Sequence, residues 1–454
     1  MKTQESREAV LAEAPVLRAI VTMAVPVILG MLVQVFYNMA DTFFIGRLND
    51  VHQLAASGIS FPFFMIMMSF GTVIGVGTAS LVSRQLGMQK RAEAGEIVSL
   101  SIVLNIIVAL VLTPVLLLFI EPILRLLGAQ GETLAHTRNY LFPLICCSAI
   151  SISNFSLGNV VRSEGAVFHA MTGQILGTLT NIILDPIMIF AMDMQIAGAA
   201  WATVIGNLVS VLYYLYCYSD KSLLNISFNR KIFTMRYITG IFSIGIPSGL
   251  NHVFISLAII VTNNLAAAYG AAVLAAMGIA QRVNSLAILF LVGLAVGCQP
   301  LVGYNYGAGN RRRLNSILKT GLILSVSSGL VLSLIFAVFS RYAVAVFTGN
   351  AEVIRYGTTM LRAMALAAPF VGVIMICMNS LQALGKAVPS LILSSGRQGI
   401  VYIPLLFLLS RFFGLTGIIF SQPIVDILVS IAASFMLYHV LRTDTHLAKR
   451  ESLQ

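Results

Sequence analysis

The chain has 454 residues, of which 58% are hydrophobic and only 10% are charged, and its mean hydropathy is +0.91. A water-soluble domain of this length cannot bury so much apolar surface in one core, so a soluble globular protein is excluded. The net charge of +11 is spread over short loops between apolar runs and forms no stripe on a soluble surface, which argues against a nucleic-acid partner.

Twelve apolar runs are long enough to cross a membrane, since a span needs about 20 mostly apolar residues. The first six lie near residues 17–44, 54–82, 96–119, 138–161, 167–190 and 197–217. The second six lie near residues 237–268, 273–302, 316–339, 356–380, 391–411 and 415–440. We therefore predict an all-α integral membrane protein with twelve transmembrane helices. The predicted parts are an N-terminal lobe (1–217), a cytoplasmic linker (218–236), a C-terminal lobe (237–440) and a cytoplasmic tail (441–454).

An even number of spans places both termini on one side of the membrane. Most of the 28 Lys and Arg residues fall on that side, in the two termini, in the basic linker and in every loop of the same parity. Positive charge collects in cytoplasmic loops. We therefore expect a multi-pass protein of a bacterial-type inner membrane with cytoplasmic N- and C-termini. The polar start of the chain runs directly into a long helix without a small-residue cleavage site, so we expect no cleaved signal peptide.

The two halves of the chain show a sparse repeat. A shift of about 220 residues aligns Pro26 with Pro247, Gly87 with Gly307, Arg91 with Arg311, Asn159 with Asn379 and Gly198 with Gly417. Two six-helix halves in the same orientation predict parallel repeats, or lobes, around a central cleft.

Acidic residues are costly in hydrocarbon, and only Asp41, Asp185 and Asp426 fall inside predicted spans. In the first span, polar side chains at i, i+3, i+4 and i+7 form one stripe, which consists of Gln34, Tyr37, Asn38 and Asp41. In the fifth span, a four-residue spacing aligns Gly173, Gly177, Asn181 and Asp185. The two glycines allow close helix contact beneath the two polar residues.

The two stripes are expected to pair, because Asp41 and Asp185 each lie a few residues before an outer loop. With Asn181 and with Thr203 of the sixth span, they supply the oxygen ligands that a hard cation such as Na⁺ accepts. Two nearby carboxylates also suit a proton site, because both cannot stay ionised cheaply. The spacing alone leaves H⁺ and Na⁺ open, and it equally allows capping or helix-bridging roles.

Other intramembrane polar residues point less clearly to a role. Asp426 has no second carboxylate in its half, and His252 is a lone histidine that either carries a proton or packs. Arg282, Arg362 and Arg397 could meet substrate, Asp426 or the membrane interface. We expect the five cysteines to be packing residues.

Several motifs together resemble the multidrug and toxic compound extrusion family. They are Pro26, the run NMADTFFIG over residues 38–46, the segment from Asn181 to Asp185-Pro186, and the two Gly-basic loops. The resemblance implies an efflux antiporter that exports organic, usually cationic and lipophilic, compounds in exchange for H⁺ or Na⁺ through a V-shaped cleft.

By position, the resemblance places Asp41, Asn181, Asp185 and Thr203 in the family's cation-binding cluster, with Asn154 as a further match. It also makes Pro26 a bend in the first helix. Asn159 and Arg282, with the residues of the first stripe, are candidates for the substrate cleft. One branch of the family carries carboxylates in its second lobe, on the seventh and tenth helices. Here Thr262 stands at the repeat position of Asp41, so we expect coupling in the first lobe.

Two other functions are alternatives to an efflux antiporter. A lipid-linked oligosaccharide flippase of the same superfamily would line its cleft with basic residues, for which the three intramembrane arginines are candidates. A membrane-embedded transferase would need a metal-binding D-x-x-D run, which the sequence lacks. It also lacks a phosphate-binding loop for ATP. We therefore expect the protein to be a transporter and not an enzyme, and to need no cofactor. Its expected partners are small organic substrates and membrane lipids, and we expect it to be a monomer.

Overall fold

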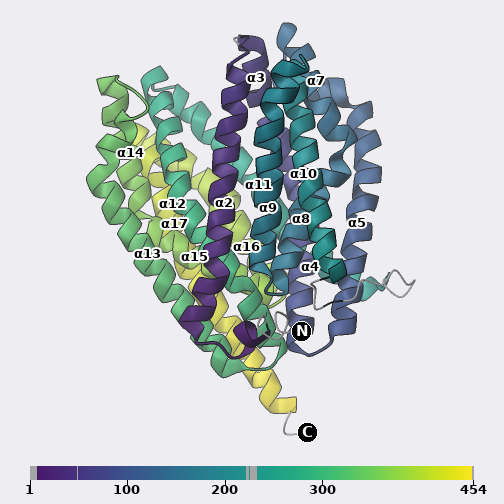
Figure 1. The fold of residues 1–454 in the computed structure, drawn as a ribbon. Helices are drawn as coiled ribbons and strands as arrows, with labels where there is room; N and C mark the ends of the chain where they lie inside the picture. The colour runs from purple at the N-terminus through teal and green to yellow at the C-terminus, as the bar shows by residue number, and fades with distance from the viewer. Residues whose placement is uncertain (1–7, 49, 221–223, 225–232, 452–454) are drawn as a thin grey trace. The chain divides into compact units, whose positions relative to one another are not determined.

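The computed structural model describes residues 8–48, 50–220, 224 and 233–451. Most of the predicted linker 218–236, namely residues 221–223 and 225–232, lies outside the described residues. The described part of the chain contains helices and no strand, as the all-α prediction requires (Figure 1).

The helices follow one another with short connections. In the first half they are α2 (Val16–Gly46), α3 (Val51–Ile59), α4 (Phe61–Gly87), α5 (Arg91–Leu118), α6 (Ile120–Leu126), α7 (Glu132–Cys146), α8 (Ser148–Ser163), α9 (Val167–Pro186), the π-helix η1 (Ile187–Ala191) and α10 (Gln195–Asp220). In the second half they are α11 (Met235–Ala267), α12 (Ala271–Gly307), α13 (Arg311–Ala345), α14 (Ala351–Leu366), α15 (Ala368–Ala383), α16 (Ala387–Ser395), the π-helix η3 (Gly396–Ile400) and α17 (Tyr402–Glu451).

These helices account for the predicted spans in order. Within the described residues, 9 helices are long and apolar enough to cross a membrane, or 11 if each of two bent helix pairs is one span. The last of them, Ala387–Thr443, covers both final predicted spans. Gly414 interrupts it with φ 58 and ψ −135, a left-handed conformation that favours glycine.

The two bent pairs are predicted spans that the structure divides. The fourth span bends by 61° between α7 and α8, and the tenth by 46° between α14 and α15. Pro369 explains the second bend, because it lies in the first turn of α15, and a proline ring disfavours helix in the residues before it. At the first bend, Pro143 lies one turn before the break at Cys147.

The chain divides into two compact units. Unit 1 contains the described residues within 1–14, 25–253 and 303–309, and unit 2 contains those within 15–24, 254–302 and 310–454. Helices α2, α11 and α12 each contribute residues to both units. In α2 the division falls between Ala24 and Val25, next to Pro26.

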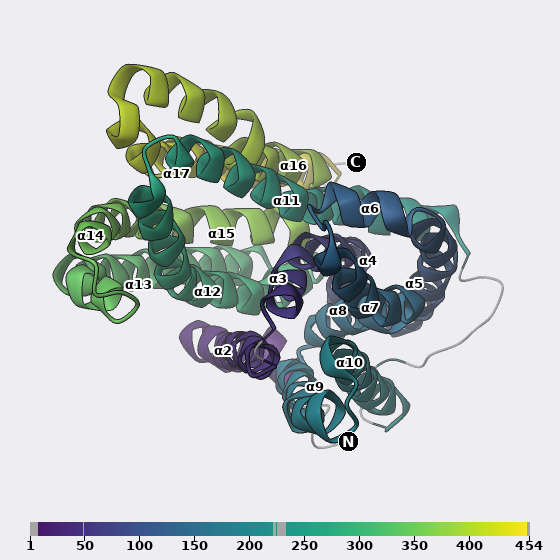
Figure 2. The ribbon, with the colours of Figure 1, turned by 90° about the horizontal axis from the view of Figure 1, so that it is seen from above.

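Unit 1 is a bundle in which α4 packs against α8 and α5, and α9 packs against α10. These helices appear end-on in Figure 2. At one end of the unit an apolar core includes Ile45, Phe63, Tyr140, Ile189 and Val204. Unit 2 is built around α13, which packs against α14 and α15, and α15 in turn packs against α17.

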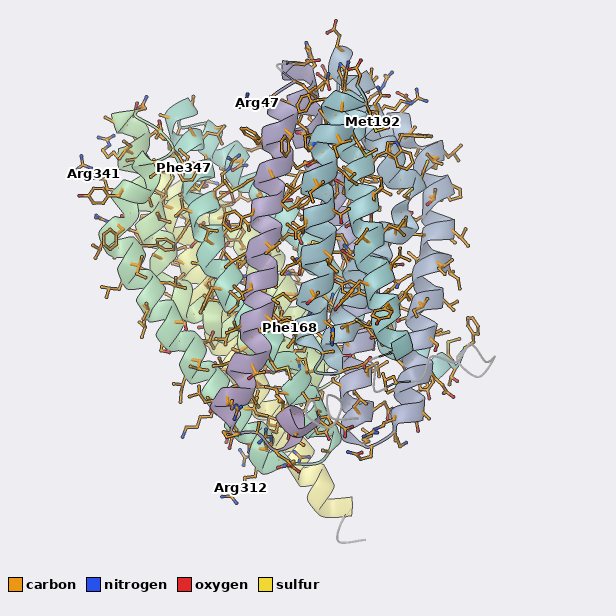
Figure 3. The ribbon with its side chains drawn as sticks, in the orientation of Figure 1. Arg47, Phe168, Met192, Arg312, Arg341 and Phe347 are labelled. Atoms are coloured by element: carbon orange, nitrogen blue, oxygen red, sulfur yellow. The ribbon has the colours of Figure 1, made fainter. Side chains whose placement is uncertain are left out.

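Large apolar side chains cover the outside of both units. Phe168 and Met192 in unit 1 and Phe347 in unit 2 are each more than half exposed (Figure 3). On α13, Arg312 lies near the start of the helix and Arg341 near its other end, with an apolar stretch between them. An apolar surface bounded by charged helix ends suits lipid as the surrounding solvent. The protein is a multi-pass membrane protein.

Candidate functional site

Thr203 joins three helices inside unit 1. Its hydroxyl lies 3.1 Å from the Tyr37 hydroxyl of α2, and it accepts a hydrogen bond of 3.3 Å from the Nδ2 of Asn181 on α9. Thr203 itself belongs to α10 and is buried. Parts of the chain that are 166 and 22 residues distant in sequence therefore meet at one hydroxyl.

Glycines bring α9 and α10 close together below this junction. A Cβ on Gly177 would lie 2.0 Å from Ser210 Oγ and 2.5 Å from the carbonyl oxygen of Gly206. A Cβ on Gly173 would lie 2.2 Å from the ring of Tyr214. Small residues therefore let the two backbones approach, as the four-residue spacing predicts. The close contact positions Asn181 one turn beyond Gly177.

The two carboxylates lie in this buried region without partners for most of their oxygens. Asp185 is 0% exposed and Asp41 is 9% exposed. Among the described residues, Asp41 Oδ1, both carboxylate oxygens of Asp185 and Asn181 Oδ1 are buried and have no hydrogen-bond partner. The charge of Asp41 acts on Asp185, and both charges act on Tyr37. A proton or a cation bound here would neutralise the two carboxylates and give these buried acceptor oxygens a partner.

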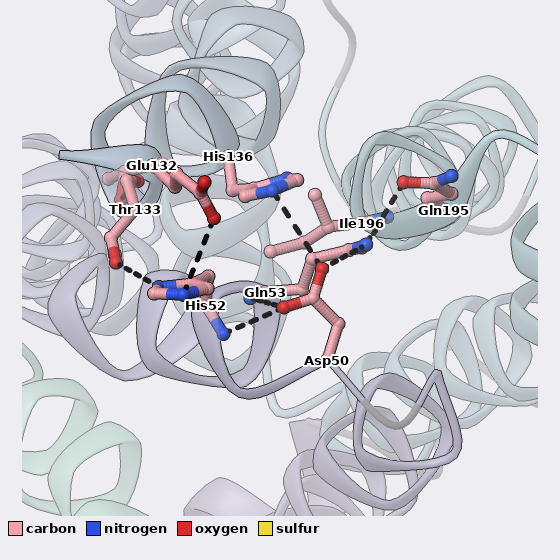
Figure 4. Close-up of polar contacts among 9 residues, drawn as sticks. Asp50, His52, Gln53, Glu132, Thr133, His136, Gln195 and Ile196 are labelled. Atoms are coloured by element: carbon pink, nitrogen blue, oxygen red, sulfur yellow. Dashed lines mark hydrogen bonds and ion pairs between the residues drawn. The ribbon is translucent and has the colours of Figure 1, made fainter.

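The loops that follow Asp41 and Asp185 meet at the same end of unit 1 (Figure 4). The side chain of Gln53 accepts a 3.0 Å hydrogen bond from the backbone N–H of Ile196 and donates a 3.0 Å bond to Gln195 Oε1. Gln53 also donates to Asp50, which caps the start of α3. The beginnings of α3 and α10 are therefore tied together, consistent with a common depth for the two carboxylates.

Contacts from α7 complete this end of the unit. His136 Nε2 lies 3.8 Å from Asp50 Oδ2. His52 lies 3.2 Å from the Thr133 hydroxyl and 3.5 Å from Glu132. Asp50 lies before the first residue of the apolar span His52–Gly87. The side-chain amide of Gln53 and the backbone N–H groups of the cap lower the pKa of Asp50.

Tyr140 of α7 is a neighbour of the site that the sequence reasoning did not single out. It is buried, and it lies close enough to Asp41, Asp185 and Tyr37 to interact with them electrostatically. A signal for it exists in the sequence. An even-numbered span starts at the end of the bundle where Asp41 lies, so a tyrosine among its first residues falls at the same depth.

The other candidates of unit 1 have different partners. Asn154 donates a 2.8 Å hydrogen bond to Asn207, and Gln34 accepts one of 2.9 Å from Gln174. Asn38 is exposed, and its carbonyl accepts a hydrogen bond from Thr42. The Oδ1 of Asn159 accepts a hydrogen bond from Arg162. The Nε2 of His252 lies 3.4 Å from the Thr72 hydroxyl. Pro26 lies inside α2, which is helical on both sides of it.

In unit 2 the charged candidates separate into paired and exposed residues. Arg397 donates a 2.8 Å hydrogen bond to Asp426, and both side chains are buried. Arg362 donates to the carbonyl of Ala337 and to Ser340. Arg282 is exposed.

The polar cluster of unit 1, which consists of Asp41, Asn181, Asp185 and Thr203, offers oxygen atoms as ligands. The part of the chain that the structure describes has no group of three His, Cys, Asp or Glu side chains that could hold a transition metal. Carboxylate, amide and hydroxyl oxygens bind hard cations. The unpartnered oxygens of Asp41, Asn181 and Asp185 therefore fit a small hard cation or protons.

Comparisons with known proteins agree with this architecture. The MatE family model matches residues 26–187 and 247–408, one copy in each half of the chain. The chain is 32% identical to the multidrug export protein MepA of Staphylococcus aureus strain MSSA476 over 429 residues, which is 94% of each protein. It is 30% identical to MepA of Staphylococcus saprophyticus over 443 residues, which is 97% of this chain and 98% of the relative.

A solved structure has the same fold over nearly the whole chain. It is described as the outward-facing conformation of a multidrug resistance MATE family transporter of the MOP superfamily, and it matches with a TM-score of 0.90 at 25% identity, over 95% of this chain and 97% of that one. The two matched segments confirm the internal repeat, since each starts at a proline of the aligned pair, Pro26 and Pro247. The chain belongs to the MatE family, the multidrug and toxic compound extrusion family that its motifs resemble.

Proposed function

We propose that this protein is a secondary active antiporter that exports organic, lipophilic and mainly cationic compounds in exchange for H⁺ or Na⁺. The observation that carries the proposal is the set of unpartnered buried oxygens on Asp41, Asn181 and Asp185. Buried carboxylates without a basic partner must be neutralised from outside the chain. An ion gradient can supply that cation, and it can release the cation again when the site opens to the other side.

Export of several compounds is the activity named for the MepA relatives, and it fits this chain because the similarity extends over 94% of its length. The Tyr37 side chain connects the first helix to Thr203, so binding of an ion at Asp41 and Asp185 would act directly on the contacts of α2. In this proposal α2 is the element that responds to the coupling ion. Pro26, where α2 passes from unit 2 to unit 1, would be its bend.

The proposed orientation has both termini in the cytoplasm, with the loops of Figure 4 on the outer side of the inner membrane. It rests on the distribution of Lys and Arg. We also propose that the protein works as a monomer without a cofactor and carries out no enzymatic reaction.

The flippase alternative is less well supported by the side-chain contacts. A pyrophosphate site needs several free basic groups, but Arg397 is paired with Asp426 and Arg362 is bonded to Ala337 and Ser340. Of the three intramembrane arginines that favoured this alternative, Arg397 is buried in an ion pair, Arg362 is exposed but hydrogen-bonded, and Arg282 is exposed.

The test is transport of a fluorescent lipophilic cation in inside-out vesicles with an imposed pH or Na⁺ gradient. Wild type is compared with Asp41→Asn and Asp185→Asn, which keep the shape of each side chain but remove its charge. Asp193→Asn is the matched control, because Asp193 is an exposed acid in the loop that follows the same span. Its φ of 52 suits asparagine as well as aspartate.

We expect gradient-driven transport in wild type and Asp193→Asn, and loss of at least tenfold in the two site variants. The gradient that drives wild-type transport identifies the coupling ion. The proposal fails if neither gradient moves the cation, or if both site variants transport like wild type.

A further inference from the structure

Among the residues of unit 2 whose burial is described, one carboxylate is buried, that of Asp426, and it already has a cation. Asp426 Oδ1 accepts a 2.8 Å hydrogen bond from Arg397 Nε and a 3.2 Å bond from Gln422 Nε2. The side chain of Asp426 is 3% exposed and that of Arg397 is 9% exposed. This ion pair connects η3 to α17 in the interior of the unit.

The contrast with unit 1 concerns charge balance. The oxygens of Asp185 and the Oδ1 of Asp41 have no hydrogen-bond partner in the described structure, whereas the guanidinium of Arg397 supplies a full positive charge to Asp426. A paired guanidinium stabilises the charged carboxylate and satisfies its lone pairs. Asp426 therefore needs neither a proton nor a metal ion from solution.

The repeat places this ion pair at an informative position. The 220-residue shift that aligns Asn159 with Asn379 places Arg397 on Gly177, and the 219-residue shift that aligns Gly198 with Gly417 places Asp426 on Asn207. In unit 1 Gly177 and Gly206, the residue before Asn207, make the backbone contact between α9 and α10, since a Cβ on Gly206 would lie 2.6 Å from the Gly177 carbonyl. Corresponding helices are thus joined by close backbone packing in one half and by a buried ion pair in the other.

The surrounding polar groups extend the same comparison. Thr262, at the repeat position of Asp41, lies 2.7 Å from the Tyr402 hydroxyl. Thr262 also donates to the carbonyl of Ala258, so the hydroxyl of Tyr402 donates to Thr262. The position that carries a carboxylate in unit 1 thus carries a neutral, hydrogen-bonded hydroxyl in unit 2.

We propose that Arg397 is a built-in counter-ion that permanently occupies Asp426, so that the second lobe carries a tethered cation and takes no part in the exchange of the coupling ion. The ion pair itself stands on the contacts of unit 2. Only the statement that coupling belongs to the first lobe rests on the proposed function. Arg397 is in this sense a positioning residue, which holds α17 and η3 together through Asp426.

Carbodiimide labelling separates the two kinds of carboxylate, because dicyclohexylcarbodiimide reacts with protonated carboxyl groups in apolar surroundings. The purified full-length protein in detergent is labelled at neutral pH without Na⁺, and the modified peptides are quantified by mass spectrometry. We expect labelling at Asp41 or Asp185 and at least tenfold less at Asp426. Labelling of Asp426 comparable to that of Asp41 would overturn the proposal.

Variants show whether Arg397 is the cause. Arg397→Gln should raise labelling of Asp426 at least tenfold, because the buried carboxylate then lacks its cation. Arg282→Gln, which removes an exposed arginine of the same unit, should leave Asp426 unlabelled. A folded Arg397→Gln protein in which Asp426 stays unreactive would contradict the assignment.

A double variant covers the case in which Arg397→Gln does not fold. Arg397→Gln with Asp426→Asn replaces the ion pair by two neutral amides of similar shape, so no uncompensated charge stays buried. We expect this variant to keep the ion dependence of transport and the number of ions exchanged per substrate. A folded double variant that has lost its ion dependence would assign coupling to Asp426 after all.

The labelling and the transport tests fail separately. Absence of ion-driven transport, or of any effect of Asp41→Asn and Asp185→Asn, would remove the proposed function and leave the Arg397–Asp426 result intact. Strong labelling of Asp426 in wild type would remove the inference and leave the first-lobe site untouched.

Discussion

Substitution of Gly177 by alanine tests whether close packing of α9 against α10 supports the candidate site. The new Cβ would lie 2.0 Å from Ser210 Oγ and 2.5 Å from the Gly206 carbonyl oxygen. The Ser210 hydroxyl donates at 2.9 Å to the carbonyl of Gly173 and must move away. Loss of that hydrogen bond costs about 0.5–1.5 kcal/mol. The backbone carbonyl cannot rotate away, so the helices must separate, at a cost of about 1–3 kcal/mol for overpacking.

Alanine also has a higher helix propensity than glycine, which returns up to about 1 kcal/mol. The net expectation is destabilisation by about 1–3 kcal/mol, which corresponds to a fall in melting temperature on the order of 5 °C for a unit of this size. Because Asn181 lies one turn beyond Gly177, the same separation should weaken its contact with Thr203 and reduce ion-driven transport.

The assay is thermal unfolding of the purified protein in one detergent at one heating rate, with transport in vesicles as the second measurement. Gly278→Ala is the control, because Gly278 lies inside α12 with nothing within 4 Å of the new Cβ. That variant should be as stable as wild type or slightly more stable. Gly177→Ala combined with Ser210→Ala should recover only the part due to the hydroxyl. Equal melting temperatures for Gly177→Ala and Gly278→Ala would refute the packing argument.

Three further predictions concern side chains at the same end of unit 1. Thr203→Val should destabilise the protein by about 1–3 kcal/mol and reduce coupled transport, because the buried Asn181 amide and the half-buried Tyr37 hydroxyl lose their partner. Thr180→Val on α9, where the hydroxyl donates to the Leu176 carbonyl of its own helix, should do neither. Asp50→Asn still caps α3 but cannot be charged. The Gln53 amide lowers the pKa of Asp50 in the folded protein, so the charged Asp50 stabilises the fold above its unfolded pKa of about 3.9. This stabilisation is lost as the pH falls through the folded pKa. The melting temperature of the variant should therefore depend less on pH below about 4 than that of wild type. Gln53→Ala should speed hydrogen exchange at the Ile196 amide, and unchanged exchange would show that this hydrogen bond does not hold α10.

The twelve spans were predictable because the length of an apolar run reports directly on the thickness of the membrane. Their ends were less predictable. The predicted span 316–339 is part of α13, which runs from Arg311 to Ala345, because a helix can continue into water after its apolar stretch has ended. The bend before Pro369 left a proline signal in the sequence, but many spans here contain a proline, and only packing decides which of them bend.

Residues within one helix could be grouped from the sequence, and contacts between helices could not. The spacing of Gly173, Gly177, Asn181 and Asp185 predicts one face of α9, since helical periodicity is local. The contacts of Tyr37 with Thr203 and of Asn154 with Asn207 join different helices. They depend on how the helices pack after the chain has turned several times. Tyr140 was missed for the same reason, although its depth could have been counted.

The ion pair of unit 2 shows the limit of reasoning from a repeat. Three arginines of the second half were possible partners for Asp426, and their positions in the sequence do not distinguish them. The repeat predicts where helices of the two halves correspond, but Gly177 and Asn207 give no sign that their counterparts are Arg397 and Asp426. The two halves of a duplicated fold can keep the same helix contacts with different side chains at the contact. Similar backbones therefore do not imply similar charges. If one half exchanges ions and the other does not, the difference lies in whether a buried carboxylate has a cation within its own chain.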